Sequence, residues 1–175
     1  MKYVGPARKK IGKRTIFNMI GPLSSPALVE RQVVGVYEKK LLKTFANGLK
    51  NLNIKFAWIV NSEDGLDEIS PYAKTNIIQL KNGQLSEISI NPNELNINAE
   101  KFENLLGDDA KFNANKLIEI FTGKDNDFSK AVCLNAAAGL IVSEKYNDFN
   151  EAYINTRKHI LNGNAFKHLT DIQNG

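Results

Sequence analysis

The most informative stretch of the sequence is Phe56-Ala57-Trp58-Ile59-Val60 with the loop that follows it, Asp64-Gly65-Leu66-Asp67-Glu68-Ile69-Ser70. The first run is apolar throughout and bounded by polar residues, which indicates an interior strand of a parallel sheet. In open α/β sheets, ligands bind beyond the carboxyl ends of the strands, where this loop would lie. Asp67 and Glu68 offer adjacent carboxylate oxygens, the hard ligands that Mg²⁺ prefers. Neighbouring acids on a turn are also commonly just solvated, so the loop alone leaves both interpretations open.

Strand and helix patterns alternate around this run. Residues 32–37 are rich in β-branched side chains, which predicts a strand, and residues 42–49 carry apolar side chains at helical spacing. With the strand at 56–60 they complete a β-α-β unit, whose crossover should be right-handed. Asn82-Gly83 lies between two further strand patterns and is the strongest hairpin signal in the chain. The helix is expected to cover the sheet with these residues: Leu42, Phe45, Ala46 and Leu49.

The first residues predict two short helices and a break. Residues 2–11 favour a helix that stops at Gly12, and residues 15–20 favour a second one. Gly21-Pro22-Leu23-Ser24-Ser25-Pro26 combines residues that interrupt regular structure. We therefore expect this segment to cross between two lobes.

The last third of the chain favours helices. Apolar residues recur at helical spacing within 114–121 and within 149–160, the second of which is expected to be the final helix. Between them, residues 131–142 are apolar or small on almost every side, so that helix should be central and closely packed. Asn135 within it must find hydrogen-bond partners and is interpreted as architectural. The whole pattern predicts an α/β fold: a mixed, mainly parallel sheet with a β-hairpin and flanking helices.

Composition and charge exclude several classes of protein. The 175 residues are 42% hydrophobic and 24% charged, with a formal net charge of +4, as in an ordinary globular domain. No apolar run approaches the roughly 18 residues that span a bilayer, so no membrane partner is expected. Cys133 is the single cysteine, which fits a reducing cytoplasm. His159 and His168 are well separated and expected on the surface, so neither a zinc cluster nor a Ser/His/Asp triad is indicated.

Basic residues gather at the start of the chain. No acid precedes Glu30, whereas the following cations do: Lys2, Arg8, Lys9, Lys10, Lys13 and Arg14. Such a cluster attracts phosphates, carboxylates or a nucleic-acid backbone. A solvated helix face would show the same pattern, because runs of charge usually decorate surfaces.

Two stretches of the chain carry a family resemblance. Residues 8–27 read RKKIGKRTIFNMIGPLSSPA, and residues 64–70 read DGLDEIS. Together they closely resemble the anthranilate phosphoribosyltransferases of tryptophan biosynthesis, whose pattern is Val-Arg-x-x-Leu-Gly-x-Arg-Thr-Ile-Phe-Asn-x-x-Gly-Pro-Leu-x-Asn-Pro-Ala. The likeness continues through residues 31–37 and 134–138. Ser25 departs from the pattern, because the family usually has Asn at that position.

The resemblance implies a fold, a reaction and roles for three residues. The fold is that of nucleoside phosphorylases and phosphoribosyltransferases, with residues 1–27 as a helical-lobe segment and hinge and residues 28–175 as the C-terminal part of the α/β glycosyltransferase domain. The amine of anthranilate would displace diphosphate from phosphoribosyl diphosphate. Asp67 and Glu68 would hold Mg²⁺. Arg8 would bind the carboxylate of anthranilate, which a guanidinium matches in a bidentate manner.

The resemblance covers only the C-terminal half of the family's chain. The Gly-Thr-Gly-Gly-Asp loop that cradles the diphosphate in the family does not occur in these 175 residues. Such glycine-rich loops bind phosphate because backbone N–H groups converge on it with no Cβ in the way. We therefore expect a missing N-terminal half as a partner, negligible transfer activity from this chain alone, and a homodimer in the full-length enzyme.

Two alternatives stay open from the sequence. A paralogue of the same fold could use its basic surface to bind nucleic acid without catalysis, although only Tyr3 and Phe17 lie near the basic residues as stacking platforms. The chain could also be a relative of the pyrimidine nucleoside phosphorylases, which cleave a nucleoside with phosphate. The base-binding signature of those enzymes is not matched at residues 8–26.

Overall fold

The computed structural model describes residues 5–13, 17–24 and 26–175 of the chain. Arg14 and Ser25 lie outside the described residues, and so do the side chains of Arg8 and of residues 17–19. The strands are β1 (Arg31–Gly35), β2 (Phe56–Ser62), β3 (Thr75–Lys81) and β4 (Gln84–Ile90). The α-helices are α1 (Gly5–Ile11), α2 (Phe17–Leu23), α3 (Leu41–Asn51), α4 (Ala110–Phe121), α5 (Asp127–Val142), α6 (Phe149–Leu161) and α7 (Asn164–Asn174), and the short 3-10 helices are η1 (Pro92–Leu95) and η2 (Phe102–Leu105).

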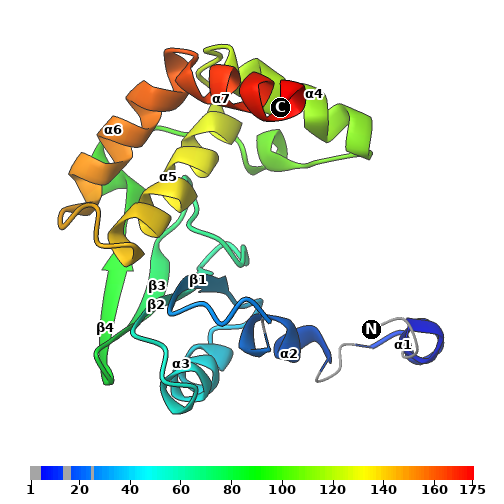
Figure 1. The fold of residues 1–175 in the computed structure, drawn as a ribbon, viewed down its shortest axis with the longest axis vertical. Helices are drawn as coiled ribbons and strands as arrows, with labels where there is room; N and C mark the ends of the chain where they lie inside the picture. Colours follow the sequence, from blue (N-terminus) through cyan, green and yellow to red (C-terminus); the bar gives the residue numbers. More distant parts are fainter. Residues whose placement is uncertain (1–4, 14–16, 25) are drawn as a thin grey trace.

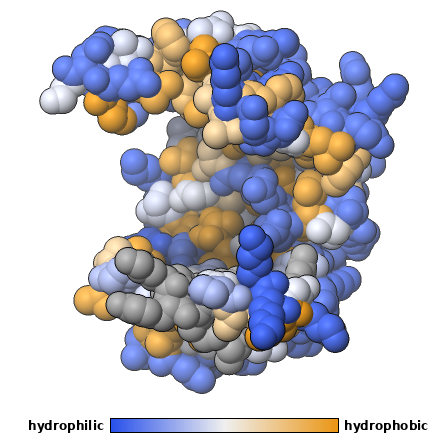
Figure 2. All heavy atoms as spheres, turned by 90° about the vertical axis from the view of Figure 1, so that its right-hand side faces the viewer, coloured by the Kyte–Doolittle hydropathy of each residue, from blue (hydrophilic) through white to orange (hydrophobic). Residues whose placement is uncertain are grey.

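Helices cover both faces of a single sheet (Figure 1). α3 packs on one face, against β2 and β3, and α5 packs on the other face, against β1 and β2. α6 lies against α5, and α4 and α7 form one end of the molecule. α2 lies next to α3 at the opposite end, with α1 beyond it. Between the two ends the surface is concave, and apolar residues gather in the concavity (Figure 2).

The four strands follow the order β1-β2-β3-β4. β1 and β2 are parallel, whereas the pairs β2–β3 and β3–β4 are antiparallel. The α/β class, the mixed sheet, the hairpin and the flanking helices are confirmed, but the expectation of a mainly parallel sheet is wrong for the described strands. The connections give the reason: only β1 and β2 are joined through a helix, while the loop 63–74 and the turn at Asn82-Gly83 each reverse the chain.

The β-α-β unit forms as the sequence predicts. All seven residues of β2 are buried, and their side chains alternate between the two faces of the sheet. Phe56, Trp58 and Val60 belong to the core beneath α5 and α6, whereas Ala57 and Ile59 belong to the core beneath α3. α3 buries the four predicted residues in the second core: Leu42, Phe45, Ala46 and Leu49.

The turn between β3 and β4 is also the predicted one. Asn82 and Gly83 have φ values of 50° and 77°, so both lie in the left-handed region. Two successive left-handed residues are typical of a type I′ turn, whose twist matches that of the strands it joins. The pairing of Lys81 with Gln84 closes the hairpin directly across this turn.

The first segment differs from the prediction at its second helix. α1 stops at Gly12, whose φ of 62° is typical of a helix end. α2 continues through residues 21–23, which the sequence assigns to a break. Pro22 keeps a helical φ and removes only one N–H donor, and the helix ends one residue later, so little is lost. Ser24 closes this end by donating its hydroxyl to the carbonyl of Ile20 at 2.8 Å, and the break begins there.

The last third contains one helix more than expected. α6 is not the final helix, because Gly163, with a φ of 83°, ends the connection and α7 follows. Apolar residues recur along α4 as the sequence indicates, but Ile120 is the one residue of that helix that is buried. His159 and His168 are exposed, as predicted. Within the described residues, none of the helices is long and apolar enough to cross a membrane. α6 buries these predicted residues: Ala152, Tyr153, Thr156 and Ile160.

Candidate functional site

The acidic loop 63–74 leaves β2 at its carboxyl end. Because β1 and β2 are parallel, the carboxyl end of β1 lies at the same edge of the sheet. The structure thus brings Asp67 and Glu68 together with two strand ends and with Asn135 of α5. They surround a cavity of about 270 Å³, lined by Val33, Gly35, Val60, Asp67, Glu68 and Asn135.

Buried hydroxyl groups anchor this loop to the sheet. Ser62, Ser70 and Thr75 are all buried. The Ser62 hydroxyl donates to the carbonyl of Glu68 at 2.6 Å. It also lies 2.6 Å from Oγ1 of Thr75, which is then the donor of that pair because Ser62 has only one proton to give. The N–H of Ser70 donates to both hydroxyl oxygens at 3.2 Å. The network fixes the backbone of Glu68 to β2 and β3.

Asn135 and Gly35 fix the loop from its two sides. Asn135 accepts a hydrogen bond from the N–H of Ile69 at 2.9 Å, and its amide donates to the carbonyls of Ile69 at 3.0 Å and Ala131 at 2.9 Å. The architectural interpretation of Asn135 is confirmed, and its partner is the acidic loop itself. At Gly35 the loop passes so close that a Cβ would lie 1.7 Å from the carbonyl oxygen of Asp67. Gly35 was not identified as a site residue from the sequence, where its only signal is its position at the end of a β-branched strand.

The acids of the loop have different roles. Asp64 is engaged by the loop, because it accepts hydrogen bonds from the hydroxyl of Ser70 and the N–H of Leu66. Asp67 and Glu68 are exposed, and within the described residues neither carboxylate forms a hydrogen bond or an ion pair. Partial burial of the carboxyl end of Glu68 raises its pKa, and the adjacent negative charge of Asp67 raises that pKa further.

Asp67 and Glu68 fit the ligands of a hard divalent cation. They are adjacent carboxylates without a hydrogen-bond partner among the described residues, on a loop that is held in place. A bound cation would offset the repulsion between their negative charges, which adds to the effect of burial in raising the pKa of Glu68. In the part of the chain that the structure describes, no group of three or more His, Cys, Asp or Glu side chains could hold a metal ion alone. Mg²⁺ commonly uses one or two carboxylates and completes its shell with water and phosphates, so a pair suffices for that cation.

The basic residues of the first segment lie in α1 and just after it. Lys9, Lys10 and Lys13 are exposed, as a solvated or anion-binding surface requires. Arg8 belongs to α1, but its side chain lies outside the described part of the structure. The contact between Arg8 and a substrate carboxylate therefore stays a prediction.

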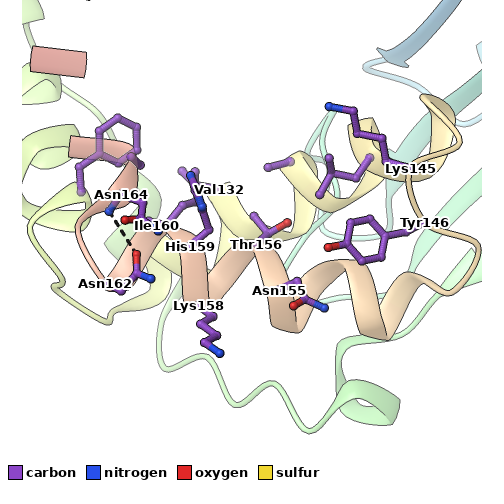
Figure 3. A pocket seen from close by; sticks show the side chains of 14 residues that line it. Val132, Lys145, Tyr146, Asn155, Thr156, Lys158, His159, Ile160, Asn162 and Asn164 are labelled. Atoms are coloured by element: carbon purple, nitrogen blue, oxygen red, sulfur yellow. Dashed lines mark hydrogen bonds between the residues drawn. The ribbon is translucent and has the colours of Figure 1, made fainter. Parts of the chain in front are cut away.

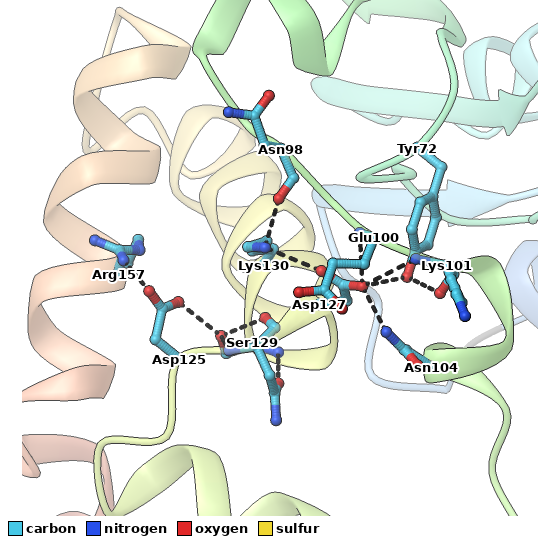
Figure 4. Close-up of polar contacts among 11 residues, drawn as sticks. Tyr72, Asn98, Glu100, Lys101, Asn104, Asp125, Asp127, Ser129, Lys130 and Arg157 are labelled. Atoms are coloured by element: carbon cyan, nitrogen blue, oxygen red, sulfur yellow. Dashed lines mark hydrogen bonds and ion pairs between the residues drawn. The ribbon is translucent and has the colours of Figure 1, made fainter.

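A second polar cluster surrounds Asp127, the first residue of α5 (Figure 4). Asp127 is only 3% exposed, and its Oδ1 accepts a hydrogen bond from the ammonium of Lys130 at 2.9 Å. Lys130 also donates to the carbonyl of Asn98 at 2.6 Å. The cluster ties the segment 98–104 to the start of α5. Further donors reach Oδ2: the Asn104 amide at 2.8 Å, the Glu100 N–H at 2.9 Å, the Tyr72 hydroxyl at 3.0 Å and the Lys101 N–H at 3.3 Å.

The donors around Asp127 decide its charge. Burial alone would raise the pKa of Asp127, but hydrogen bonds from Asn104, Lys130 and two backbone N–H groups hold that pKa well below its usual range. Burial and the adjacent carboxylate raise the pKa of the Tyr72 hydroxyl. Asp127 is thus ionised at neutral pH and has a structural role. Asp127 was not identified from the sequence, although Asn126 and Ser129 on either side of it form a capping box, which is a recognisable signal of a helix start.

Comparison with known proteins settles the family. A family model described as glycosyl transferase family, a/b domain, matches residues 1–166. The chain belongs to this glycosyl transferase family. One relative within the family is the anthranilate phosphoribosyltransferase of Pelagibacter ubique (strain HTCC1062), 74% identical over 99% of this chain and 53% of that protein. The chain spans about half the length of the curated relatives it matches.

Solved structures of the glycosyl transferase family share the fold. Anthranilate phosphoribosyltransferase from Thermus thermophilus superposes with a TM-score of 0.87 at 27% identity, over 98% of this chain and 50% of that chain. The enzyme from Saccharomyces cerevisiae, in complex with PRPP and Mg, superposes with a TM-score of 0.85 at 26% identity, over 97% of this chain and 49% of that chain. The fold expected from the family resemblance is confirmed.

Proposed function

We propose that this chain forms the cation-binding half of the active site of an anthranilate phosphoribosyltransferase. The reaction transfers the phosphoribosyl group from phosphoribosyl diphosphate to the amine of anthranilate and releases diphosphate. The high identity to the Pelagibacter ubique enzyme supports this proposal. So does the likeness to a yeast enzyme in complex with PRPP and Mg. The nucleic-acid-binding and nucleoside-phosphorylase alternatives have no comparable observation in their favour.

The observation that carries the proposal is that, among the described residues, the carboxylates of Asp67 and Glu68 have no hydrogen-bond or ion-pair partner, although the loop backbone beside them is anchored by Ser62 and Asn135. Asp67 and Glu68 would hold Mg²⁺, which supplies electrostatic stabilisation for the negative charge on a departing diphosphate. Asn135, Gly35 and the Ser62 hydroxyl hold the loop backbone in place before any ligand arrives. Because the carboxylates are positioned in advance, no reorganisation is required at the moment of reaction.

Arg8 would orient the acceptor. A guanidinium fork can form two parallel hydrogen bonds to the planar carboxylate of anthranilate, which Lys cannot do. Such a contact fixes the ring and leaves its amine free to attack, so it contributes through proximity and orientation. An aromatic amine attacks as the neutral base, so no strong general base is required among the residues of this chain.

The donor-phosphate cradle is not in these 175 residues, so we propose that another half of the enzyme supplies it. This chain alone should form no measurable N-(5-phosphoribosyl)anthranilate. Joined to the part of the Pelagibacter ubique enzyme that it does not span, it should form the product in the presence of Mg²⁺. The cytoplasm is the expected location, and a homodimer is expected only for the complete enzyme.

The test is a double variant in the joined enzyme. Asp67→Asn with Glu68→Gln should lower Mg²⁺-dependent turnover by about 100-fold or more, because loss of preorganised charge stabilisation has effects of this size. Glu63→Gln is the matched control, since Glu63 is an exposed acid of the same loop and does not line the cavity. Unchanged kinetics in the double variant would remove the metal assignment, and phosphorolysis of a pyrimidine nucleoside would reverse the proposed reaction.

A further inference from the structure

From Ala131 to Val142, α5 is apolar or small around almost its whole circumference, but neighbouring elements cover only part of it. The sheet covers one side and α6 covers another. One stripe of the helix, at the i, i+4, i+7 and i+8 positions of a single face, stays partly or fully exposed. A helix that is hydrophobic on all sides is normally enclosed on all sides. We call this the open stripe; it consists of Val132, Ala136, Gly139 and Leu140.

Three residues of the open stripe, Val132, Ala136 and Leu140, line one wall of a cavity of about 840 Å³, and α6 forms the other wall (Figure 3). Gly139 lies beside them on the same exposed face of α5. Lys145 and Tyr146 lie at one end of the cavity, and Asn162 and Asn164 lie at the other. On the α6 wall, Oγ1 of Thr156 is buried and has no hydrogen-bond partner among the described residues. Proteins seldom leave buried polar groups unpaired, so this wall also lacks a neighbour.

The small residues of the open stripe suit the close approach of a second helix. Gly139 is exposed, its φ is ordinary, and a Cβ at this position would meet no heavy atom within 4 Å. Ala136 is exposed one turn earlier on the same face. The distance between two packed helices depends on the side chains at the contact, so this pair allows the shorter end of the usual range.

The charge around the cavity selects the kind of partner. Lys145, Lys158 and His159 line it, and no carboxylate of the described residues does. Neither lysine forms an ion pair with any acid of the described residues. A second copy of this chain, docked symmetrically on the same patch, would place these cations against their own copies. The charge therefore favours a different partner, one that brings acidic side chains or a helix C-terminus to the rim.

We propose that the open stripe docks a helix from the part of the relatives' chain that this chain does not span. About half of each relative's length is unmatched, which is enough chain to supply such a helix. That helix should present a narrow apolar face to Ala136 and Gly139 and acidic groups to Lys145 and Lys158. The docking requires neither substrate nor cation, so it is tested independently of the proposed reaction.

The experiment compares this chain alone with the same chain joined, in the relatives' order, to the unmatched part of the Pelagibacter ubique enzyme. Gly139→Leu is introduced in both, and the thermal midpoint is measured by circular dichroism. In the chain alone the midpoint should stay equal or rise, because the new side chain enters open space and Gly is a poor helix former. In the joined protein it should fall by about 4 °C or more, as the leucine blocks the helix contact.

Asn47→Leu is the matched control, because Asn47 is an exposed helical position on α3, at the opposite face of the sheet. Asn47→Leu should shift the thermal midpoints of the chain alone and of the joined protein by the same amount. The proposal is overturned if Gly139→Leu shifts both proteins alike. It is also overturned if sedimentation shows that this chain alone dimerises and that Gly139→Leu abolishes the dimer, since a second copy would then occupy the stripe.

Discussion

Gly35 allows the acidic loop to lie close to β1 because glycine has no Cβ. A Cβ added at residue 35 would lie only 1.7 Å from the carbonyl oxygen of Asp67. Gly35→Ala must therefore push the loop outward, and we expect it to destabilise the fold by about 1–3 kcal/mol, the usual cost of overpacking. The same shift should weaken Mg²⁺ binding by Asp67 and Glu68 in the joined enzyme. Urea unfolding and titration calorimetry measure the two effects.

Gly139→Ala is the control for this substitution, because the added methyl group enters open space in an exposed helix. It should leave this chain as stable as before or slightly more stable. If Gly35→Ala behaved in the same way, the close approach between β1 and the loop would be wrong.

Asp127 acts at the scale of the element, because it joins the first turn of α5 to the segment 98–104. Its pKa is lowered in the folded state, so its contribution to stability is present above the ordinary pKa of an aspartate and is lost as the pH falls below it. Asp127→Asn should destabilise the fold at pH 7 by about 3 kcal/mol, since it leaves Lys130 and several donors without their anion. Stability between about pH 5 and pH 2 should then vary less with pH than in the wild type.

Urea unfolding measured across this pH range tests the role of Asp127. Asp109→Asn is a suitable control, because Asp109 caps α4 but is exposed, and Asn is also a good capping residue. An equal pH dependence in the wild type and Asp127→Asn would show that this carboxylate is not the source of the acid sensitivity.

Local patterns predicted the elements that depend on local chemistry. The spacing of apolar residues in α3 identified its buried face, and Asn82-Gly83 identified a turn that requires two left-handed residues. Patterns of this kind do not show which element covers a face. The apolar spacing within α4, for example, predicts the helix but does not show that Ile120 is its one buried residue. The direction of β3 relative to β2 was misjudged because it depends on the path of loop 63–74 and not on the sequence of the strand itself.

The candidate site could be predicted only in part. Asp67 and Glu68 stand next to each other in the sequence, so their proximity needs no fold. The groups that position them come from separate elements: Gly35 from β1, Thr75 from β3 and Asn135 from α5. Only the fold brings these residues together, and the sequence around each of them contains no motif that marks it as part of a site.

Considered over the whole molecule, the net charge of +4 is too small to support tight binding of nucleic acid. The cations of α1 lie at one end, and few aromatic residues accompany them in the sequence. We expect no measurable affinity for a single-stranded oligonucleotide even at low salt. Fluorescence anisotropy of a labelled strand tests this, and binding that weakens steeply with salt would restore the nucleic-acid alternative.

The engagement of Asp64 has a consequence for mutagenesis. In an alanine scan of residues 64–68, we expect the loss of activity at Asp64 to be as severe as at Asp67 and Glu68. Without the carboxylate of Asp64, the turn loses the acceptor for the Ser70 hydroxyl and the Leu66 N–H. A survey that scores only lost function would thus count one ligand too many. Replacement of Asp64 by asparagine distinguishes scaffold from ligand, since it retains an acceptor oxygen while discarding the charge.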